Sequence, residues 1–446
     1  MKEISVNFNK IIGEMKIMHA VNNGPVWKAT ADQRISNMDA YREAGFPYAR
    51  NHDASFFSMY GGEHTVDVHM IFPDFDKDPY DPDSYDFHLT DEYCQVIKKG
   101  GAEVFYRLGS KIEHETKKYG TLPPKDFKKW AVICEHIIKH LNYGWADGLH
   151  LGIEYWEIWN EPDLDTDDST HKRCWGGTKK EFIEFYNVAA THLKEKFPEL
   201  KIGGPASSGN WEWMEDFLSE LKAPLDFFSW HVYGDNPERV EKYAIDAKKL
   251  LEKHGYSNVE SILNEWNYIK GWEDDDFIYS MDMMRKTEGA AFVTSSMCLC
   301  QHAPVDMLMY YDARPSGYSM FDTIIFSRCY KNYYPFKMFN TLYKLKNEAE
   351  LILSDNIYGL AAKNENEAAI MLTHFNRWDN RNSNIGEYAL KINDLNLGSN
   401  VKAEIYLLDD KHDLELIKEE NINVSDFTLN LEFDEYTEYL IKFIKM

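Results

Sequence analysis

Residues 155–162 read Tyr-Trp-Glu-Ile-Trp-Asn-Glu-Pro, and the architecture of the chain can be worked out from this run. Its first residues are bulky and mostly aromatic, which favours a buried strand. The run ends at Asn160 and Glu161, where Pro162 turns the chain because proline has a fixed φ and no N–H. Polar residues directly after a buried strand are typical of parallel sheets with functional side chains at their carboxyl ends.

Seven further runs of this kind alternate with amphipathic segments of helical period, such as 127–141, 180–197 and 239–254. Alternation of this sort predicts repeated βα units and a parallel sheet. The eight predicted strands are residues 13–21, 48–52, 103–108, 155–160, 201–204, 225–232, 259–264 and 305–311. Eight such strands wrapped by helices predict an α/β fold, a (β/α)8 TIM barrel over residues 13–348.

After about residue 351 the pattern changes to short strand-like runs separated by Asn, Asp and Gly. These runs are residues 359–363, 368–375, 387–392, 402–408, 427–431 and 438–443. They predict a C-terminal antiparallel β-sandwich, to which the alternating residues 2–8 could add a strand. We therefore expect an accessory domain made of residues 1–12 and 349–446, packed closely on the barrel because no low-complexity linker separates the two.

The composition excludes several classes of partner. A formal net charge of −25 argues against binding to nucleic acid or to an anionic membrane surface, since both require clustered basic residues. No segment approaches about 18 consecutive apolar residues, and the first ten residues lack the apolar core of a secretory signal. We therefore expect a cytoplasmic location. Aromatic residues make up 15% of the chain, which suits stacking on sugar rings as well as core packing.

A second run, Ser-Ile-Leu-Asn-Glu-Trp-Asn at residues 261–267, also follows a predicted strand and presents the carboxylate of Glu265. Three βα units separate Glu161 from Glu265, so their strands should face each other across the barrel mouth. Hydrolysis of a glycosidic bond needs one carboxyl group to protonate the leaving oxygen and another to attack the anomeric carbon. We therefore predict Glu161 as the acid/base and Glu265 as the nucleophile.

The two carboxyl groups need different environments. Glu161 must stay protonated near neutrality, and Trp156 and Trp159 could supply the apolar walls that raise its pKa. Glu265 must be ionised, and Arg50 at the end of the second strand could hold it charged. The structural alternatives are an exposed turn glutamate for Glu161 and a helix N-cap for Glu265.

Other side chains at the strand ends are predicted to bind the substrate. Asn160 is expected to hydrogen-bond the 2-hydroxyl group of the sugar. The remaining predicted substrate-binding residues are His52, Asp53, Arg50, His231, Tyr233, Trp266, Tyr311 and Trp175. For the histidines and aromatic residues the alternative is a purely structural role in the core. Trp272, in a loop beyond a strand end, is a further candidate for a sugar platform.

These motifs resemble those of glycoside hydrolase family 39, a clan A family that includes β-xylosidases and α-L-iduronidase. The resemblance rests on the Trp-Asn-Glu-Pro run at 159–162, the Trp-His-Val-Tyr run at 230–233 and the Arg-Asn-His run at 50–52. It implies a retaining mechanism. Two runs depart from the family pattern: Asn264 precedes the nucleophile where threonine is usual, and Tyr-Tyr-Asp-Ala-Arg-Pro at 310–315 replaces a Tyr-Trp-x-x-Ser-Asp run. The second departure leaves the identity of the sugar open.

The predicted function is a retaining exo-glycosidase that releases terminal pentosyl residues, first of all β-D-xylosyl, from small oligosaccharides or glycosides. The alternatives are an α-L-arabinosidase or another exo-glycosidase of the clan, and, from a different class, a non-catalytic carbohydrate-binding barrel. We expect no metal and no cofactor. The histidine pair His136 and His140 lacks the glutamate of zinc-protease helices, residues 163–174 lack the glycine and final glutamate of a calcium loop, and no nucleotide-binding loop is present. A homo-oligomer is left open.

Overall fold

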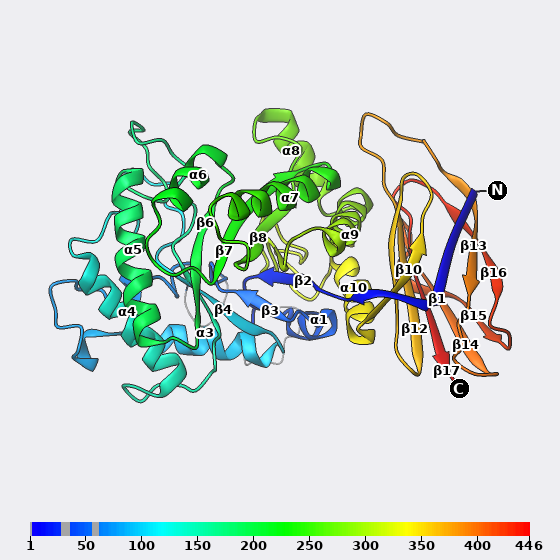
Figure 1. Cartoon of the computed structure of the whole chain (residues 1–446), viewed down its shortest axis with the longest axis horizontal. Coiled ribbons are helices and arrows are strands. Elements are labelled where there is room, and N and C mark those ends of the chain that lie inside the picture. Colours follow the sequence, from blue (N-terminus) through cyan, green and yellow to red (C-terminus); the bar gives the residue numbers. More distant parts are fainter. Residues whose placement is uncertain (1, 28–35, 56–61) are drawn as a thin grey trace.

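The computed structural model describes residues 2–27, 36–55 and 62–446, and it has two parts (Figure 1). The larger part is a closed barrel of parallel strands in the order β2 to β9. The strands are β2 Ile17–Asn22, β3 Tyr48–Arg50, β4 Glu103–Leu108, β5 Tyr155–Ile158, β6 Lys201–Ser207, β7 Phe227–Gly234, β8 Glu260–Tyr268 and β9 Met307–Tyr310. The predicted eight-stranded barrel is therefore confirmed.

Helices follow the strands and cover the outside of the barrel (Figure 1). They are α1 Met38–Ala44, α2 Val68–Ile71, α3 His88–Lys99, α4 Phe127–Tyr143, α5 Lys179–Lys196, α6 Trp211–Glu220, α7 Pro237–Lys253, α8 Asp274–Met283, α9 Thr287–His302 and α10 Tyr334–Leu345. Local sequence sets several ends. The Asp126 side chain accepts hydrogen bonds from two backbone N–H groups at the start of α4, and Thr178 and Glu181 form a capping box at the start of α5. No helix among the described residues combines the length and apolar composition that a membrane crossing requires.

Side chains alternate between the barrel interior and the surrounding helices, as the period of a strand requires. In β5, Tyr155 belongs to a small core inside the barrel, whereas Trp156 and Ile158 belong to the larger core shared with the helices. The inner core also contains Phe105, Phe227 and Met307, which lie in the first halves of their strands. Apolar side chains thus fill the amino-terminal half of the barrel and leave the carboxyl ends to polar side chains.

The smaller part is a nine-stranded sheet in the order β15-β14-β17-β12-β11-β10-β1-β13-β16. Its strands are β1 Lys2–Glu14, β10 Asn347–Ile352, β11 Ile357–Lys363, β12 Glu367–His374, β13 Gly386–Asn393, β14 Val401–Leu408, β15 Asp413–Ile422, β16 Phe427–Phe433 and β17 Glu438–Lys445. The predicted N-terminal strand joins this sheet as β1, which pairs parallel with β13 and antiparallel with β10. Strands β10 and β15 were not predicted, since charged residues interrupt the apolar alternation of both.

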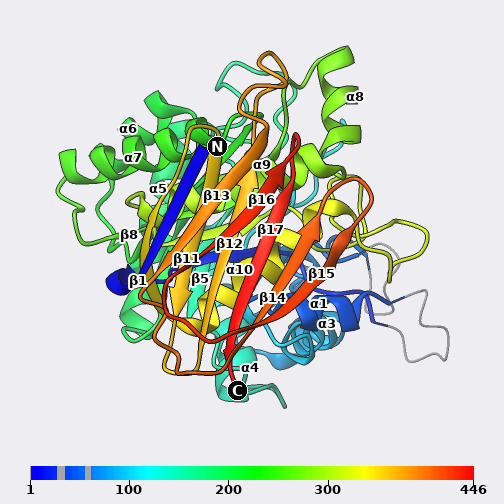
Figure 2. The same ribbon diagram turned by 90° about the vertical axis from the view of Figure 1, so that its right-hand side faces the viewer.

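The sheet folds over its own core (Figure 2). Phe427 in the edge strand β16 packs against Phe443 in β17, with ring centroids 5.8 Å apart. In the order of the sheet, five strands lie between these two: β12, β11, β10, β1 and β13. Phe8 of β1 contacts the same ring from 6.0 Å. The predicted antiparallel sandwich is therefore one continuous sheet that encloses a single apolar core.

Helices α9 and α10 lie between the barrel and the sheet (Figure 1). Thr294 of α9 donates a hydrogen bond to Glu438 of β17, and both side chains are buried. The Arg381 guanidinium, from the loop before β13, lies 2.9 Å from Glu288 of α9. These contacts join the sheet to the barrel through α9, which packs against β8 and β2.

Candidate active site

Glu161 and Glu265 meet at the carboxyl end of the barrel. One oxygen of each carboxylate and one ring nitrogen of His231 lie within 4.8 Å of one another. His231 Nδ1 is 2.8 Å from Glu161 Oε1 and 3.8 Å from Glu265 Oε2. The glutamate side chains are 13% and 9% exposed, so both still reach the surface of the site. The structure thus brings the two predicted carboxylates together in one place that a ligand can enter.

An irregular turn after β5 aims Glu161 into this site. Trp159 and Glu161 have φ values of 77° and 45°, in the left-handed region that side chains other than glycine seldom adopt. Two backbone hydrogen bonds hold the turn, from Trp159 N to Leu108 O at 2.7 Å and from Glu161 N to Ala206 O at 2.8 Å. The neighbouring strands β4 and β6 therefore fix the backbone that carries Glu161, and strained residues held in this way are typical of functional sites.

Arg50 connects the two glutamate-bearing strands. It is fully buried, and its Nη1 lies 3.3 Å from Glu265 Oε2. Its Nη2 donates to Asn160 Oδ1 at 2.7 Å, which leaves the amide NH2 group of Asn160 available to a ligand. Tyr233 OH donates to the other oxygen of Glu265 at 2.6 Å. Both Glu265 oxygens therefore accept hydrogen bonds that favour the ionised form.

Glu157, which the sequence analysis did not single out, supports Arg50 from below. Its Oε2 accepts from Arg50 Nε at 2.6 Å, and its Oε1 accepts from Ser229 Oγ at 2.6 Å and from Asn264 Nδ2. Glu157 is fully buried, so it needs this complete set of partners. The sequence did contain a signal for Glu157: it is a charged residue two positions after Tyr155, so it faces the interior of the barrel.

The surroundings of Glu161 and Glu265 affect the pKa values of the two carboxyl groups differently. Burial raises the pKa of Glu161 to about 8, and the nearby Asp163 carboxylate acts in the same direction. Burial and the charge of Glu161 also raise the pKa of Glu265, but His231, Arg50 and the Tyr233 hydrogen bond oppose them. Among the described residues the only hydrogen-bond partner of the Glu161 carboxyl is His231, whose own pKa is lowered by burial. The proton is therefore best placed on Glu161.

The expected apolar walls of Glu161 lie elsewhere. Trp156 points out of the barrel and stacks on Tyr106, with ring centroids 4.9 Å apart. Trp159 also faces the helices: its ring lies 5.1 Å from that of Trp175, and its Nε1 donates to Cys174 O at 2.8 Å. Burial of the carboxyl group and the charge of Asp163 take the place of the predicted tryptophan walls.

Two predicted substrate-binding tryptophans are core residues, and the structure contradicts their assignment. Trp266 is 0% exposed and faces the helix layer, where its ring lies 6.1 Å from that of Phe292. It follows the inward-facing Glu265, and the next side chain along a strand points to the opposite face. Trp175 is 4% exposed, packs against Phe185 and donates its Nε1 to Thr178 O at 3.0 Å. Neither ring can contact a ligand in the barrel mouth.

Trp272 is better placed than either of them. It lies in the loop after β8 and is 58% exposed. Its ring centroid is 5.1 Å from that of Tyr233, the residue that hydrogen-bonds Glu265. An exposed indole next to the site is the kind of surface on which the apolar face of a sugar ring stacks.

The remaining predicted residues lie together on the β3 and β9 side of the mouth. Tyr311 OH donates to Asp53 Oδ2 at 2.9 Å, and the ring of His52 lies 6.2 Å from that of Tyr311. Arg314, which was not predicted, lies 3.0 Å from Asp53 Oδ2. Burial opposes ionisation of Asp53, but Arg314 holds the pKa of this carboxyl group below its usual range. Arg314 belongs to the run at 310–315 that departs from the family pattern.

The two sequence patterns weighed as metal sites make other contacts. His136 Nδ1 is 2.8 Å from Val132 O, and His140 Nε2 is 2.9 Å from Asp91. Asp163 accepts hydrogen bonds from Ser207 at 2.6 Å and from the backbone of Ser208 at 2.8 Å, which fixes the loop after Glu161. These side chains therefore serve the helices and the loop in which they lie.

Comparisons with known proteins find a family and several relatives to which this chain is similar. Residues 75–269 match the family model described as Glycosyl hydrolases family 39. A β-xylosidase of Caldicellulosiruptor saccharolyticus is 27% identical over 247 residues, which are 52% of this chain and 46% of that protein. A β-xylosidase of Geobacillus stearothermophilus is 32% identical over 148 residues, which are 31% of this chain and 25% of that protein. The chain thus spans less than half the length of these curated relatives.

Solved structures share the fold. The crystal structure of a glucosidase from Croceicoccus marinus superposes with a TM-score of 0.84 at 22% identity, covering 100% of this chain and 99% of that one. At this identity the likeness speaks for the fold alone. The family match, by contrast, runs from before β4 to the end of β8 and includes both Glu161 and Glu265. The part of the barrel that carries the paired glutamates is therefore similar to family 39 of the glycosyl hydrolases.

Proposed function

We propose that the protein is a retaining exo-glycosidase that removes terminal pentosyl residues, first of all β-D-xylosyl, from small oligosaccharides or glycosides. The observation that carries the proposal is the carboxylate pair, with oxygens and a shared histidine nitrogen all within 4.8 Å. Retaining enzymes hold their two carboxyl groups about 5–5.5 Å apart, whereas inverting enzymes leave about 6.5–9.5 Å for a water molecule. The two curated relatives named β-xylosidases support the choice of sugar.

In the first step, Glu265 attacks the anomeric carbon. The bond from that carbon to the leaving oxygen breaks as the bond to the Glu265 carboxylate forms, and Glu161 gives its proton to the leaving oxygen. Arg50 and Tyr233 hold the nucleophile in position. The amide NH2 of Asn160 would donate to the sugar 2-hydroxyl group, a contact that strengthens in the transition state.

In the second step, water hydrolyses the glycosyl-enzyme. Glu161, now ionised, takes a proton from the water as its oxygen attacks the anomeric carbon, and Glu265 leaves as a carboxylate. His231 keeps Glu161 pointed at the reacting atoms through its hydrogen bond of 2.8 Å. Net retention of configuration follows from the two displacements.

The buried charged side chains on the β9 side of the mouth support the choice of exo action. There Arg314, Asp53 and Asp312 form a buried ion network, with Arg314 Nε lying 3.0 Å from Asp312 Oδ2. A site that is closed on one side by side chains holds the end of a sugar chain rather than its middle. The run at 310–315 that builds this wall is also the run that departs from the family pattern, so it is the part of the site most able to change the preferred sugar.

A mechanism-based label tests the proposal. A 2-deoxy-2-fluoro-β-D-xyloside with a good leaving group should modify the protein once, and digestion followed by mass spectrometry should find the label on Glu265. Asp163→Asn is a matched control, because it removes a neighbouring carboxylate while leaving the nucleophile in place. Binding of the xyloside without any label would favour the carbohydrate-binding barrel instead. A screen of nitrophenyl glycosides then ranks xylosides against α-L-arabinosides.

A further inference from the structure

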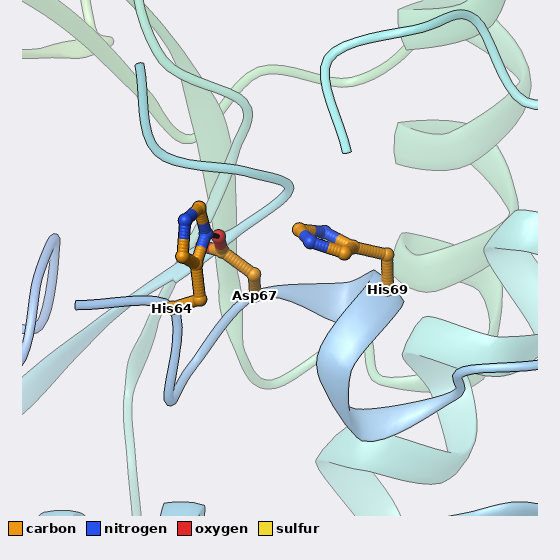
Figure 3. Close-up of side chains that lie close together, drawn as sticks. All are labelled: His64, Asp67 and His69. Atoms are coloured by element: carbon orange, nitrogen blue, oxygen red, sulfur yellow. Dashed lines mark hydrogen bonds and ion pairs between the residues drawn. The ribbon is translucent and has the colours of Figure 1, made fainter. Parts of the chain in front are cut away.

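A second cluster of titratable side chains lies apart from the carboxylate pair, in the segment between β3 and β4 (Figure 3). It consists of His64, Asp67 and His69, and one ligand atom from each lies within 4.8 Å of the others. His64 Nδ1 is 2.6 Å from Asp67 Oδ2. Figure 3 shows the His69 side chain leaving the first turn of α2 with its ring directed toward the other two residues.

Asp67 is held in place by partners on its other oxygen. It is 0% exposed, and its Oδ1 accepts from Arg107 Nη2 at 2.6 Å and from Lys111 N at 3.1 Å. Oδ2 is the oxygen that faces His64. Hydrogen bonds to the far oxygen of a carboxylate are the usual outer support of a metal ligand, because they fix its orientation.

The two imidazole rings complete the cluster. Their centroids are 5.6 Å apart and their planes are nearly perpendicular. His69 Nδ1 is buried and has no hydrogen-bond partner among the described residues, which is unusual for a buried polar atom. Gly120 makes room for this ring, since a Cβ at position 120 would lie 2.2 Å from His69 Nδ1. The fold therefore reserves space for a histidine whose own hydrogen bonds it does not satisfy.

We propose that His64, Asp67 and His69 bind one divalent transition-metal ion of the zinc class, with water in the remaining position. Two imidazoles and one carboxylate suit such an ion, and three protein ligands with one open position are a common zinc arrangement. Ligand atoms around a tetrahedral zinc ion lie roughly 3.4 Å apart, given metal–ligand bonds of about 2.0–2.2 Å. The ion would thus replace the hydrogen bond between His64 and Asp67 after a small separation of the two. The His64 side chain is 39% exposed, which gives the ion access.

The ion would tie the segment after β3 to β4. The Arg107 Nη2 that bonds Asp67 also donates to His52 O at 2.6 Å, so the cluster supports the backbone next to Asp53. None of the three ligands touches Glu161 or Glu265, so we expect the ion to raise the thermal stability of the fold without taking part in hydrolysis. The spacing His-x-x-Asp-x-His was present in the sequence, but the roles of His64 and His69 depend on the turn that the structure gives them.

Cobalt provides the test, because Co²⁺ in a tetrahedral site absorbs visible light. The full chain, stripped with a chelator, should take up one equivalent of Co²⁺ with this spectrum, Zn²⁺ should displace it, and the melting temperature should rise with Zn²⁺. His64→Gln and His69→Gln, made separately, should each weaken Zn²⁺ binding by at least about 10–100-fold, the cost of removing even an outer partner of a ligand. His136→Gln is the control, since that histidine bonds a backbone carbonyl instead.

Several outcomes would overturn the proposal. The site is not a metal site if no tetrahedral spectrum develops, or if both histidine variants melt like the wild type without metal and still bind Zn²⁺ as tightly. A spectrum abolished by Glu161→Gln and kept by His69→Gln would place the ion at the catalytic carboxylates instead. Labelling of Glu265 by the fluoroxyloside in the presence of chelator is a separate readout, so failure of the glycosidase proposal can be told from failure of this one.

Discussion

The guanidinium of Arg50 lies 3.3 Å from the carboxylate of Glu265, with no solvent around the arginine. The same guanidinium contacts Glu157 and Asn160, so one buried cation fixes residues from β5 and β8 at once. A bidentate, planar donor is needed for this, because lysine offers a single point charge. The position of the proposed nucleophile relative to the proposed acid therefore depends on a residue of a third strand.

Replacing Arg50 tests this dependence. Arg50→Lys keeps the positive charge but loses the several planar N–H donors of the guanidinium. We expect kcat to fall while KM changes little, because Arg50 positions Glu265 rather than binding the substrate. Arg50→Met leaves the buried Glu157 carboxylate without its cation and should destabilise the fold by about 3–5 kcal/mol. Steady-state kinetics and thermal melts measure the two effects. Wild-type kcat in Arg50→Lys would contradict the role given to Arg50.

Removal of the acid should leave an enzyme that can be rescued. We expect Glu161→Ala to lose turnover of natural glycosides by about 10²–10⁴-fold, the usual contribution of general acid catalysis. Aryl glycosides with good leaving groups need no proton, so they should still form the glycosyl-enzyme, which then accumulates. Added azide should restore turnover by attacking that intermediate, and the product can be identified by mass spectrometry. Unchanged hydrolysis of a natural xyloside would remove Glu161 from the mechanism.

Much of this site could be predicted from the sequence, because the end of a barrel strand is visible as a change from apolar to polar residues. Glu161 and Glu265 each follow a run of buried residues, and the number of βα units between them places them across the mouth. It was harder to predict which side chains of a strand face the barrel interior and which face the helices. The register of β7 with β8 shifts between Trp230 and His231, and that of β8 with β9 shifts between Leu263 and Trp266. Strict alternation along β8 could not be assumed, and Trp266 was assigned to the wrong face.

Other features depend on contacts between residues distant in the chain. Glu157 becomes a buried support of Arg50 only when β3, β5, β7 and β8 close into one barrel. The folding of the nine-stranded sheet over itself is likewise set by packing such as that of Phe427 on Phe443. Neither relationship can be predicted from the pattern of neighbouring residues in the sequence.

The charge of Asp163 should set the upper pH limit of activity. The proposed mechanism requires protonated Glu161, so we expect activity to fall as the pH rises through its pKa of about 8. Asp163→Asn removes a negative charge that raises this pKa, and the alkaline limb of the kcat/KM profile should therefore move to lower pH. The pH profile of a nitrophenyl xyloside measures the shift. A limb that stays in place, or moves to higher pH, would show that Asp163 does not tune the acid.

The raised pKa of Glu161 should also cost stability at neutral pH. The unfolded chain releases this proton near the ordinary glutamate pKa of 4.5, whereas in the folded chain the pKa is about 8. The folded state is thus favoured by this group below pH 4.5, and the advantage is lost as the pH rises toward 8. Glu161→Gln has no proton to release, so it should be more stable than the wild type by about 2–4 kcal/mol near pH 8 and by little near pH 4. Denaturant unfolding at both pH values checks this, and a difference that does not grow with pH would count against the buried acid.

Replacing two tryptophans that follow Glu265 in the chain, Trp266 in β8 and Trp272 in the loop after it, should have different effects. Trp266 is fully buried among helix residues, so Trp266→Ala should destabilise the fold by about 3–5 kcal/mol. Trp272 is 58% exposed beside Tyr233, so Trp272→Ala should leave the melting temperature nearly unchanged and raise KM for xylo-oligosaccharides. Thermal melts and kinetics on both variants separate packing from sugar binding. If Trp272→Ala keeps the wild-type KM, the indole is no platform and the sugar is held by the polar side chains of the mouth alone.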